Sequence, residues 1–320
     1  MSASLTVIEP SENLPAALGP ELASAVELAQ AEKAASTRKA YGTDFRLFRA
    51  WCDAKGVSSL PAAAETVAAY LAAEAEMARP STLGRRVAAI RYAHRLAGLP
   101  LPTDSEGVKA TMRGIRRTFG SAKVRKAPAV AAKMLGMVAT APVDLAGLRD
   151  RALLLLGFAG AFRRSELVAL DVADIEETEA GLRVTIRHSK TDQEGQGVTI
   201  AIARGDVACP VKALRGWLGA ASIDAGPLFR PINKAGRVAE KRLTDRSVAN
   251  IVKAYAERAG FDASTFSGHS LRSGFLTSAA AKGASIFKMM DVSRHRSVET
   301  LRGYVRDAEM FKDHAGAGLL

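Results

Sequence analysis

The sequence predicts a mainly α-helical protein with a small antiparallel β-sheet, an α+β fold in which an all-α domain comes first. Apolar residues recur at helical spacing over most of the 320 residues, whereas alternation with period 2 is confined to two neighbouring segments. The charge also changes along the chain. We expect an acidic N-terminal tail (1–30), an all-α domain (31–122), a basic linker (123–128) and a second domain that contains the sheet (129–320).

The composition excludes several classes of protein. Hydrophobic residues make up 48% of the chain and charged residues 24%, which excludes wholesale disorder. The longest apolar stretch, Ala152 to Phe162, is shorter than the roughly 20 residues that cross a bilayer, and the N-terminus does not resemble a secretory signal. Cys52 and Cys209 are isolated, so we expect neither a disulfide framework nor a cysteine zinc site, and a cytoplasmic location fits.

Positive charge is concentrated in the first domain. Residues 1–30 hold four acidic and no basic side chains, which is the wrong sign for a polyanion. Residues 31–127 hold 18 basic and eight acidic side chains. The whole chain has a net charge of +12, which favours a polyanionic partner, with nucleic acid as the first candidate.

The first two helices of the all-α domain follow from apolar spacing and from helix-end signals. Ser36 or Thr37 can cap the first helix, and Gly56 would end it. Its apolar face would consist of Tyr41, Phe45, Phe48 and Cys52. A second helix is predicted over residues 66–77.

The next two helices carry the cations that point to DNA. One begins at Ser81 and ends at Gly98, and the other begins at Asp104. The apolar face of the latter would consist of Val108, Met112, Ile115 and Phe119. The basic residues beside the two apolar faces are Arg85, Arg86, Arg91, Arg95, Lys109, Arg113, Arg116 and Arg117. A charged helix face is ordinarily just solvated, but its repetition on consecutive helices favours binding of the DNA backbone.

The second domain combines helices with one hairpin. Residues 149–158 have the composition of a buried helix, and residues 182–188 and 198–202 alternate as the two strands of a hairpin. Later helices are predicted over residues 211–220, 245–259 and 268–282, after Ser285, and after Ser297, which would cap the helix that contains Tyr304.

Common motifs for nucleotide or metal chemistry are missing from the sequence. It contains no Gly-x-x-x-x-Gly-Lys phosphate loop, no Gly-x-Gly-x-x-Gly turn after a strand and no His-Glu-x-x-His. The histidines are scattered, at His94, His188, His269, His295 and His314. We therefore expect phosphate chemistry here to proceed with neither a metal nor another cofactor.

The segment Ser267-Gly-His-Ser-Leu-Arg-Ser273 indicates such chemistry. His269 and Arg272 would share a helix face, where an imidazole can move a proton and a guanidinium can bridge two phosphate oxygens. Three other segments add the same residue types in order. They are Arg163-Arg-Ser-Glu-Leu167, Lys190 at the hairpin turn, and Arg294-His295, with Tyr304 nine residues after His295.

This ordered set resembles the tyrosine recombinase (phage integrase) family, over residues 31 to about 311. The resemblance implies that the catalytic residues are Arg163, Lys190, His269, Arg272, His295 and Tyr304, with Glu166 as a supporting acid. The family commonly has glycine before the later histidine, where this chain has Arg294. Lys234 and Lys241, on another loop, are alternatives to Lys190.

The implied mechanism is metal-free transfer of a phosphodiester to tyrosine. Tyr304 would attack the phosphorus while Arg163 and Arg272 hold the non-bridging oxygens. His269 would take the phenolic proton and Lys190 would protonate the departing 5′ oxygen. A hydrogen bond from the later histidine to the phosphate would complete the site. The product would be a 3′-phosphotyrosyl enzyme, whose bond energy allows religation without ATP.

The resemblance also implies an assembly. The simple Cre-like or Xer-like architecture would close two domains around double-stranded DNA at a specific recombination site. Residues 307–320 would dock on a neighbouring protomer of a homotetramer that holds two DNA sites. The enzyme would act in the cytoplasm, on the bacterial nucleoid.

Other interpretations of the same residues remain open at this point. A type IB topoisomerase-like enzyme uses much the same chemistry but relaxes supercoils without exchanging strands. A catalytically silent DNA-binding regulator would not need the nucleophile, and a metal-dependent carboxylate transposase would need an acidic triad that does not stand out. Singly, Tyr304 could anchor a helix to the core, with Tyr255 among the other candidate nucleophiles, and Arg163 and Arg272 could be internal ion-pair partners.

Overall fold

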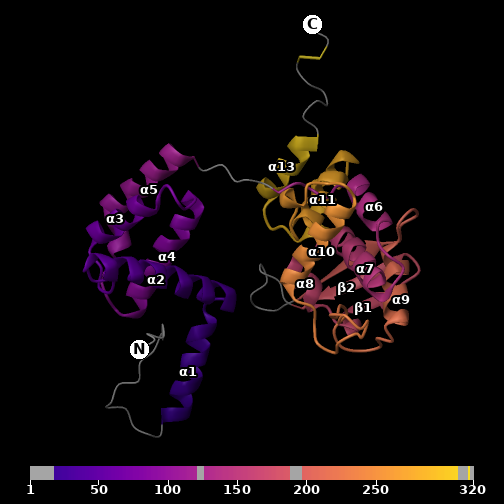
Figure 1. The fold of residues 1–320 in the computed structure, drawn as a ribbon, viewed down its shortest axis with the longest axis horizontal. Coiled ribbons are helices and arrows are strands. Elements are labelled where there is room, and N and C mark those ends of the chain that lie inside the picture. The colour runs from indigo at the N-terminus through magenta and orange to yellow at the C-terminus, as the bar shows by residue number, and fades with distance from the viewer. Residues whose placement is uncertain (1–17, 121–125, 188–196, 309–315, 318–320) are drawn as a thin grey trace. The chain divides into compact units, whose positions relative to one another are not determined.

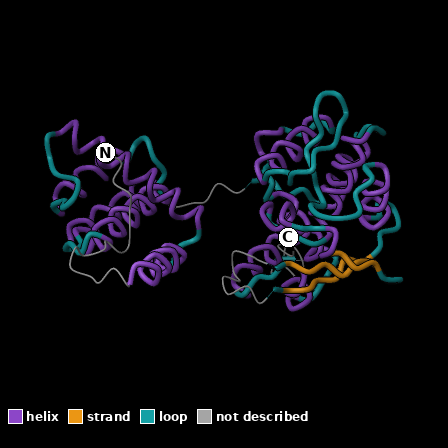
Figure 2. The backbone as a smooth tube through the Cα atoms, turned by 90° about the horizontal axis from the view of Figure 1, so that it is seen from below, coloured by secondary structure: helices purple, strands orange, loops and turns teal. Residues whose placement is uncertain are grey.

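The computed structural model is mainly helical, with one three-stranded antiparallel sheet among the described residues, which confirms the predicted fold class (Figures 1 and 2). The residues that it describes are 18–120, 126–187, 197–308 and 316–317. The chain divides into two compact units, Met1–Val124 and Arg125–Leu320. Within the described ranges, no helix is both long and apolar enough to cross a membrane.

The described part of the first unit is built from helices alone. They are α1 (Gly19–Ala31), α2 (Ala35–Lys55), α3 (Ala64–Glu74), α4 (Pro80–Leu96), the 3-10 turn η2 (Pro102–Asp104) and α5 (Glu106–Phe119). The predicted cap of α2 is wrong, because the helix begins before Ser36, at Ala35, with no side chain bound at its N-terminus. Helix α5 begins after the predicted Asp104 because Ser105 caps it, accepting a hydrogen bond from Val108 N at 3.2 Å.

One apolar cluster holds the first unit together. Its largest side chains come from α2, α3, α4 and α5 and are Phe45, Phe48, Tyr70, Leu71, Leu83, Ile90, Met112 and Ile115. The apolar spacing predicted for α2 and α5 accounts for four of these eight positions, Phe45, Phe48, Met112 and Ile115. Phe119 is an exception, because its side chain is 48% exposed at the end of α5.

The second unit combines helices with its sheet, which lies at one edge of the unit in Figure 2. The helices before the sheet are α6 (Ala131–Ala139), α7 (Leu145–Ala159) and α8 (Arg164–Ala169), followed by the 3-10 turn η3 (Val172–Asp174). The strands are β1 (Ile175–Glu177), β2 (Gly181–Ile186) and β3 (Val198–Ala203). The later helices are α9 (Pro210–Ala220), α10 (Asp245–Arg258), the 3-10 turn η4 (Ala263–Thr265), α11 (Ser270–Ala281), α12 (Ile286–Ser293) and α13 (Val298–Ala308).

The sheet confirms the predicted hairpin and adds a strand. Its order is β1-β2-β3, and Val184 of β2 lies opposite Ile200 of β3 and Ile175 of β1. Alternate residues of β2 and β3 point into the core, as the period of 2 requires. The three-residue strand β1 is too short to give a period, which is why the sequence did not predict it.

Close packing fixes the position of α11 in the second unit. A β-carbon at Gly157 of α7 would lie 2.8 Å from Leu271 Cδ1, so the glycine lets α11 approach α7 closely. On another side, a β-carbon at Gly274 would lie 2.0 Å from the backbone oxygen of Ala129, whose N–H donates to Ser270 O at 2.9 Å. Neighbours on two sides therefore hold the helix that begins beside His269.

Candidate active site

The turn between α7 and α8 supplies carbonyl groups on which the site is built. Ala161 has a φ of +45°, which is uncommon for a residue other than glycine. Its carbonyl oxygen accepts hydrogen bonds from Arg272 Nη1 at 2.6 Å and from Arg294 Nη2 at 3.1 Å. The carbonyl of Gly160 accepts another from Arg294 Nη1 at 3.1 Å. This single turn therefore holds guanidinium groups from two distant parts of the sequence.

Glu166 joins two arginines through its two carboxylate oxygens. Its Oε1 accepts from Arg163 Nη1 at 2.6 Å, and its Oε2 accepts from Arg163 N at 2.9 Å and from Arg294 Nη2 at 2.8 Å. The Glu166 side chain is only 1% exposed. Burial alone would raise its pKa, but the charge of Arg294 and the hydrogen bonds from Arg163 lower the pKa of Glu166 below its ordinary value. The carboxylate is therefore ionised at neutral pH.

Arg272 is a buried cation without a carboxylate partner among the described residues. It lies in the first turn of α11 and is 1% exposed. Burial, followed by the charges of Arg163 and Arg294, lowers the pKa of Arg272 to about 9, so the side chain is still protonated at pH 7. A buried charge is stabilised by an opposite charge. An anion bound beside Arg272 would supply that charge.

His295 lies directly against Arg272. Both of its ring nitrogens are 3.3 Å from Arg272 Nη2, and its Nδ1 is 2.8 Å from Ser293 Oγ. Burial, followed by the charges of Arg272 and Arg163, lowers the pKa of His295 to about 4, so the ring is neutral at pH 7. When the Ser293 hydroxyl donates to Nδ1, the ring proton is on Nε2, where it is available to an acceptor.

His269 is the residue from which α11 begins. Its carbonyl oxygen accepts from Ser273 N at 3.0 Å, and part of the residue is open to solvent. Partial desolvation of the ring, followed by the charges of Arg272, Arg163 and Arg164, lowers the pKa of His269. The neutral imidazole, which can accept a proton, is therefore the favoured form at neutral pH.

Tyr304 lies on α13, which contacts α11 at one end of the second unit (Figure 1). The residue is half-buried against a small apolar cluster that contains Leu276 and Leu301. Its ionised form would also act on the pKa of Arg272, raising it. The structure therefore places Tyr304 both at the edge of a core and within electrostatic range of the arginine cluster.

Some of the predicted site residues fall outside what the structure describes. Lys190 and most of the hairpin turn are among them, as is most of the predicted C-terminal segment 307–320. The alternative lysines, Lys234 and Lys241, are both exposed. Tyr255, the alternative tyrosine, is 2% exposed in the core, where burial and Asp150 raise its pKa to about 12.

Two residues that sequence reasoning did not assign belong to the site. Ser293 is fully buried, and its hydroxyl contacts His295 as described above. Arg294, which stands where the family commonly has glycine, forms the ion pair with Glu166. Arg163, Arg272 and Arg294 together outnumber the one carboxylate, so this cluster has a net charge of +2 (three positive charges less one). A site of this charge suits a phosphate group.

The eight predicted DNA-binding cations of the first unit fall into two groups. Four form ion pairs, which are Arg85 with Asp44, Arg86 with Glu74, Arg91 with Asp104 and Arg113 with Glu106. The other four are exposed and have no ion-pair partner in the described part of the chain, and they are Arg95, Lys109, Arg116 and Arg117. Arg86 is only 12% exposed and lies 5.7 Å from the ring centre of Tyr70. Its contacts are therefore mainly internal.

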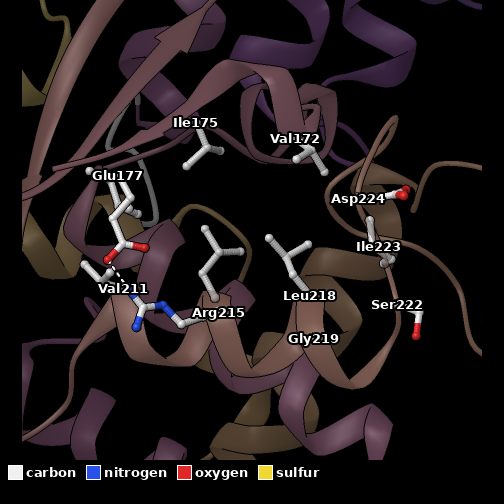
Figure 3. A pocket seen from close by; sticks show the side chains of 12 residues that line it. Val172, Ile175, Glu177, Val211, Arg215, Leu218, Gly219, Ser222, Ile223 and Asp224 are labelled. Carbon is white, nitrogen blue, oxygen red and sulfur yellow. Dashed lines mark hydrogen bonds and ion pairs between the residues drawn. The ribbon is translucent and has the colours of Figure 1, made fainter.

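A hollow of about 530 Å³ lies elsewhere in the second unit, between the sheet and α9 (Figure 3). Its walls are mostly apolar, with the ion pair of Glu177 and Arg215 at 2.5 Å on one side. None of its lining residues belongs to the arginine cluster. In the described ranges, no group of three or more His, Cys, Asp or Glu side chains is placed to hold a metal ion.

Comparisons with known proteins agree with this arrangement. The model of the phage integrase family matches residues 128–310. The chain is 42% identical over 290 residues to the integrase/recombinase xerD homolog of Selenomonas ruminantium, covering 88% of this chain and 85% of that protein. It is 26% identical to recombinase cre of Escherichia phage P1, covering 82% of each.

Solved structures show the same fold at low sequence identity. A lambda integrase dimer bound to a COC′ core site has a TM-score of 0.63 at 16% identity, covering 93% of this chain and 83% of that one. The XerH site-specific recombinase in a post-cleavage complex with palindromic difH substrate has a TM-score of 0.61 at 14% identity, covering 88% of this chain and 79% of that one.

Proposed function

Since this chain belongs to the phage integrase family, the family of the tyrosine recombinases, we propose that Tyr304 is the nucleophile with which it cleaves and rejoins DNA. The chain is a site-specific DNA recombinase that uses the tyrosine mechanism. The observation that carries our assignment is that Glu166 holds Arg163 and the Ala161 carbonyl holds Arg272, while Tyr304 lies on α13, which packs against α11, the helix of Arg272.

The cleavage step can be assigned to residues of the site. Tyr304 Oη forms a bond to phosphorus as the bond from phosphorus to the 5′ oxygen breaks, which leaves a 3′-phosphotyrosyl enzyme and a 5′-hydroxyl. Arg163 and Arg272 stabilise the charge that develops on the non-bridging oxygens, and His295 donates a hydrogen bond to one of them. The lowered pKa of His269 supports its role as the base that removes the phenolic proton.

Lys190 is proposed as the general acid that gives the 5′ oxygen its proton. This assignment rests on its position at the hairpin turn, after strand β2. Strand β2 ends at Ile186, and Arg187 beyond it is bound to Asp171 at 2.5 Å and to Asp174 at 2.8 Å. The chain therefore leaves β2 through a residue that two carboxylates hold in place, which supports a fixed starting point for the turn that contains Lys190.

DNA binding is assigned to the first unit as well as to the second. Members of the family are DNA enzymes, and the exposed unpaired cations Arg95, Lys109, Arg116 and Arg117 support a phosphate-binding role for residues 31–122. We propose that residues 129–320 form the catalytic domain and that four copies act together on two DNA sites. The proposed place of action is the bacterial nucleoid.

The experiment is covalent trapping on a nicked suicide substrate made from the genomic flanks of the gene. The wild type is expected to give a protein–DNA band on a denaturing gel, and Tyr304→Phe is expected to give none. Tyr255→Phe is the matched control, because this tyrosine is buried away from the arginine cluster. A band that persists in Tyr304→Phe but is lost in Tyr255→Phe would overturn the assignment. Relaxation of plasmid that lacks the site, without recombinants, would contradict strand exchange.

A further inference from the structure

Arg294 is a buried arginine in a backbone conformation that favours glycine. It ends α12 with a φ of +58°, and its side chain is 5% exposed. Residues other than glycine are strained in this left-handed region of backbone conformation. The contacts of the guanidinium group must offset that strain, so they indicate what the arginine does.

The guanidinium group of Arg294 links the two elements that hold the phosphate-binding arginines. Its Nη2 donates to Oε2 of the Glu166 carboxylate, and the Oε1 atom of the same carboxylate accepts from Arg163. The same Nη2 also donates to the Ala161 carbonyl oxygen, which accepts from Arg272. Its Nη1 donates to Gly160 O at 3.1 Å. The group also lies over the ring of Phe162, 5.2 Å from its centre. Arg294 therefore shares one acceptor with Arg163 and another with Arg272.

We propose that Arg294 is a positioning residue that fixes Arg163 and Arg272 in the relative placement that a scissile phosphate requires. This inference rests on the proposed function of the site. Arg294 does not contact DNA, because its side chain is covered by Gly160, Ala161, Phe162 and Glu166. It acts through Glu166 and through the Ala161 carbonyl.

The carboxylate of Glu166 shows why a second arginine matters. With Arg294 present, Glu166 Oε2 is occupied, and Arg163 binds the carboxylate through one side-chain nitrogen, Nη1. Without Arg294, Oε2 would keep only the hydrogen bond from Arg163 N and could also accept a second guanidinium N–H of Arg163, since arginine and carboxylate prefer a two-bond arrangement. Such a pair would turn the Arg163 donors away from the phosphate. Arg294 thus keeps those donors available.

Arg294→Met and Arg294→Lys test this inference. Single-turnover cleavage of the suicide substrate at saturating DNA is expected to slow by about 100-fold in Arg294→Met, the order of loss that a misplacement of about 1 Å produces. DNA affinity is expected to stay within about 3-fold of the wild type, because only the reacting phosphate is affected. Arg294→Lys keeps the buried charge, so it guards against loss of folding, and it is still expected to slow cleavage because an ammonium group cannot bridge the same acceptors.

The matched control is Arg149→Met. Arg149 is also a mostly buried arginine of the second unit, 11% exposed and paired with Asp150 at 2.7 Å, but it has no contact with the cluster around Glu166. Its substitution is expected to lower thermal stability while leaving the cleavage rate at saturating DNA within about 3-fold of the wild type. Cleavage losses that match in Arg149→Met and Arg294→Met would reduce Arg294 to a structural role and overturn the inference.

Two further measurements separate positioning from loss of structure. The first uses two phosphorothioate substrates, each with sulfur in place of one of the two non-bridging oxygens of the scissile phosphate. The cleavage rates of the two substrates report the contacts of the two oxygens separately. If the arginines are misplaced, the ratio of these two cleavage rates is expected to differ between Arg294→Lys and the wild type. An unchanged ratio would contradict positioning. In a double-mutant cycle, Arg294→Met is expected to cost much less in a Glu166→Gln background, and additive losses would show that Arg294 does not act through Glu166.

Adduct formation by the wild type distinguishes failure of the positioning role from failure of the proposed function. If the wild type forms the covalent adduct and the Arg294 variants cleave equally fast, only the positioning role is overturned. If the wild type forms no adduct on its site, the proposed function fails, and the positioning role fails with it.

Discussion

Replacing Glu166 with glutamine is expected to destabilise the second unit by about 3–5 kcal/mol, the usual cost of breaking a buried ion pair. The carboxylate accepts three hydrogen bonds, two from Arg163 and one from Arg294, at 2.6–2.9 Å. A glutamine amide has one carbonyl oxygen, so its NH2 group would face an N–H donor at the other end. At least one hydrogen bond is lost, and the charge of Arg294 remains buried without its partner.

The assay is urea unfolding followed by tryptophan fluorescence. The chain has two tryptophans, and Trp217 is fully buried in the second unit, so a Trp51→Phe background leaves it as the reporter. Glu177→Gln is the matched control, because Glu177 also binds two arginines, Arg204 at 2.7 Å and Arg215 at 2.5 Å, but at a partly exposed position. We expect the control to lose less than about 1 kcal/mol. Equal losses in the two variants would refute the reasoning.

The pH dependence gives a second check of the same carboxylate. Because the pKa of Glu166 is lower in the folded than in the unfolded protein, its contribution is present above the unfolded pKa and is lost as the pH falls through the folded value. The stability difference between wild type and Glu166→Gln is therefore expected to be constant near neutrality and to shrink below about pH 4.5. A difference that grows on acidification would contradict the assigned direction of the pKa shift.

Three other predictions concern packing, DNA binding and a buried histidine. Gly274→Ala is expected to lower the melting temperature, at a cost of about 1–3 kcal/mol, because its β-carbon would lie 2.0 Å from a backbone oxygen, whereas Gly216→Ala, with open space around it, is expected to be neutral or stabilising. In a plot of the logarithm of the DNA association constant against the logarithm of the salt concentration, Arg116→Gln is expected to reduce the slope by about 0.9. The side chain of Arg86 is mostly buried, so an equal change in Arg86→Gln would contradict the DNA-binding role that we assign to exposed cations. Burial lowers the pKa of His94, so the free energy of unfolding of the wild type is expected to fall as the pH drops below about 6.5, by at most about 1.4 kcal/mol per pH unit. If the free energy of unfolding of His94→Gln falls equally steeply with pH, the decrease does not come from His94.

Much of the candidate site could be predicted because its residue types, and the order in which they occur along the chain, are those that phosphate chemistry needs. Short motifs predict Arg163, His269, Arg272 and His295 as site residues, and in the structure the charges of Arg163 and Arg272 act on both histidines. The sequence also predicted the two strands of the hairpin, whose alternation is regular. Patterns that repeat over several residues are visible without the fold, because the period itself carries the information.

The parts that could not be predicted depend on contacts between distant residues. Arg294 and Glu166 are 128 positions apart, and no local pattern shows that they meet. Likewise, the helix spacing identified Arg85 as a surface cation, but not its ion pair with the buried Asp44 at 2.7 Å. Helix α7 begins at Leu145, earlier than predicted, because Asp144 caps it.

The most direct test of the central claim is to identify the amino acid that becomes bound to DNA. The trapped adduct would be digested with nuclease and trypsin and sequenced by mass spectrometry. Cleavage after Arg302 and Arg306 gives the peptide Gly303-Tyr-Val-Arg306. We predict a nucleotide linked through its 3′-phosphate to Tyr304 in this peptide. A nucleotide on any other residue, or a 5′ linkage, would contradict the assignment of Tyr304 as the nucleophile.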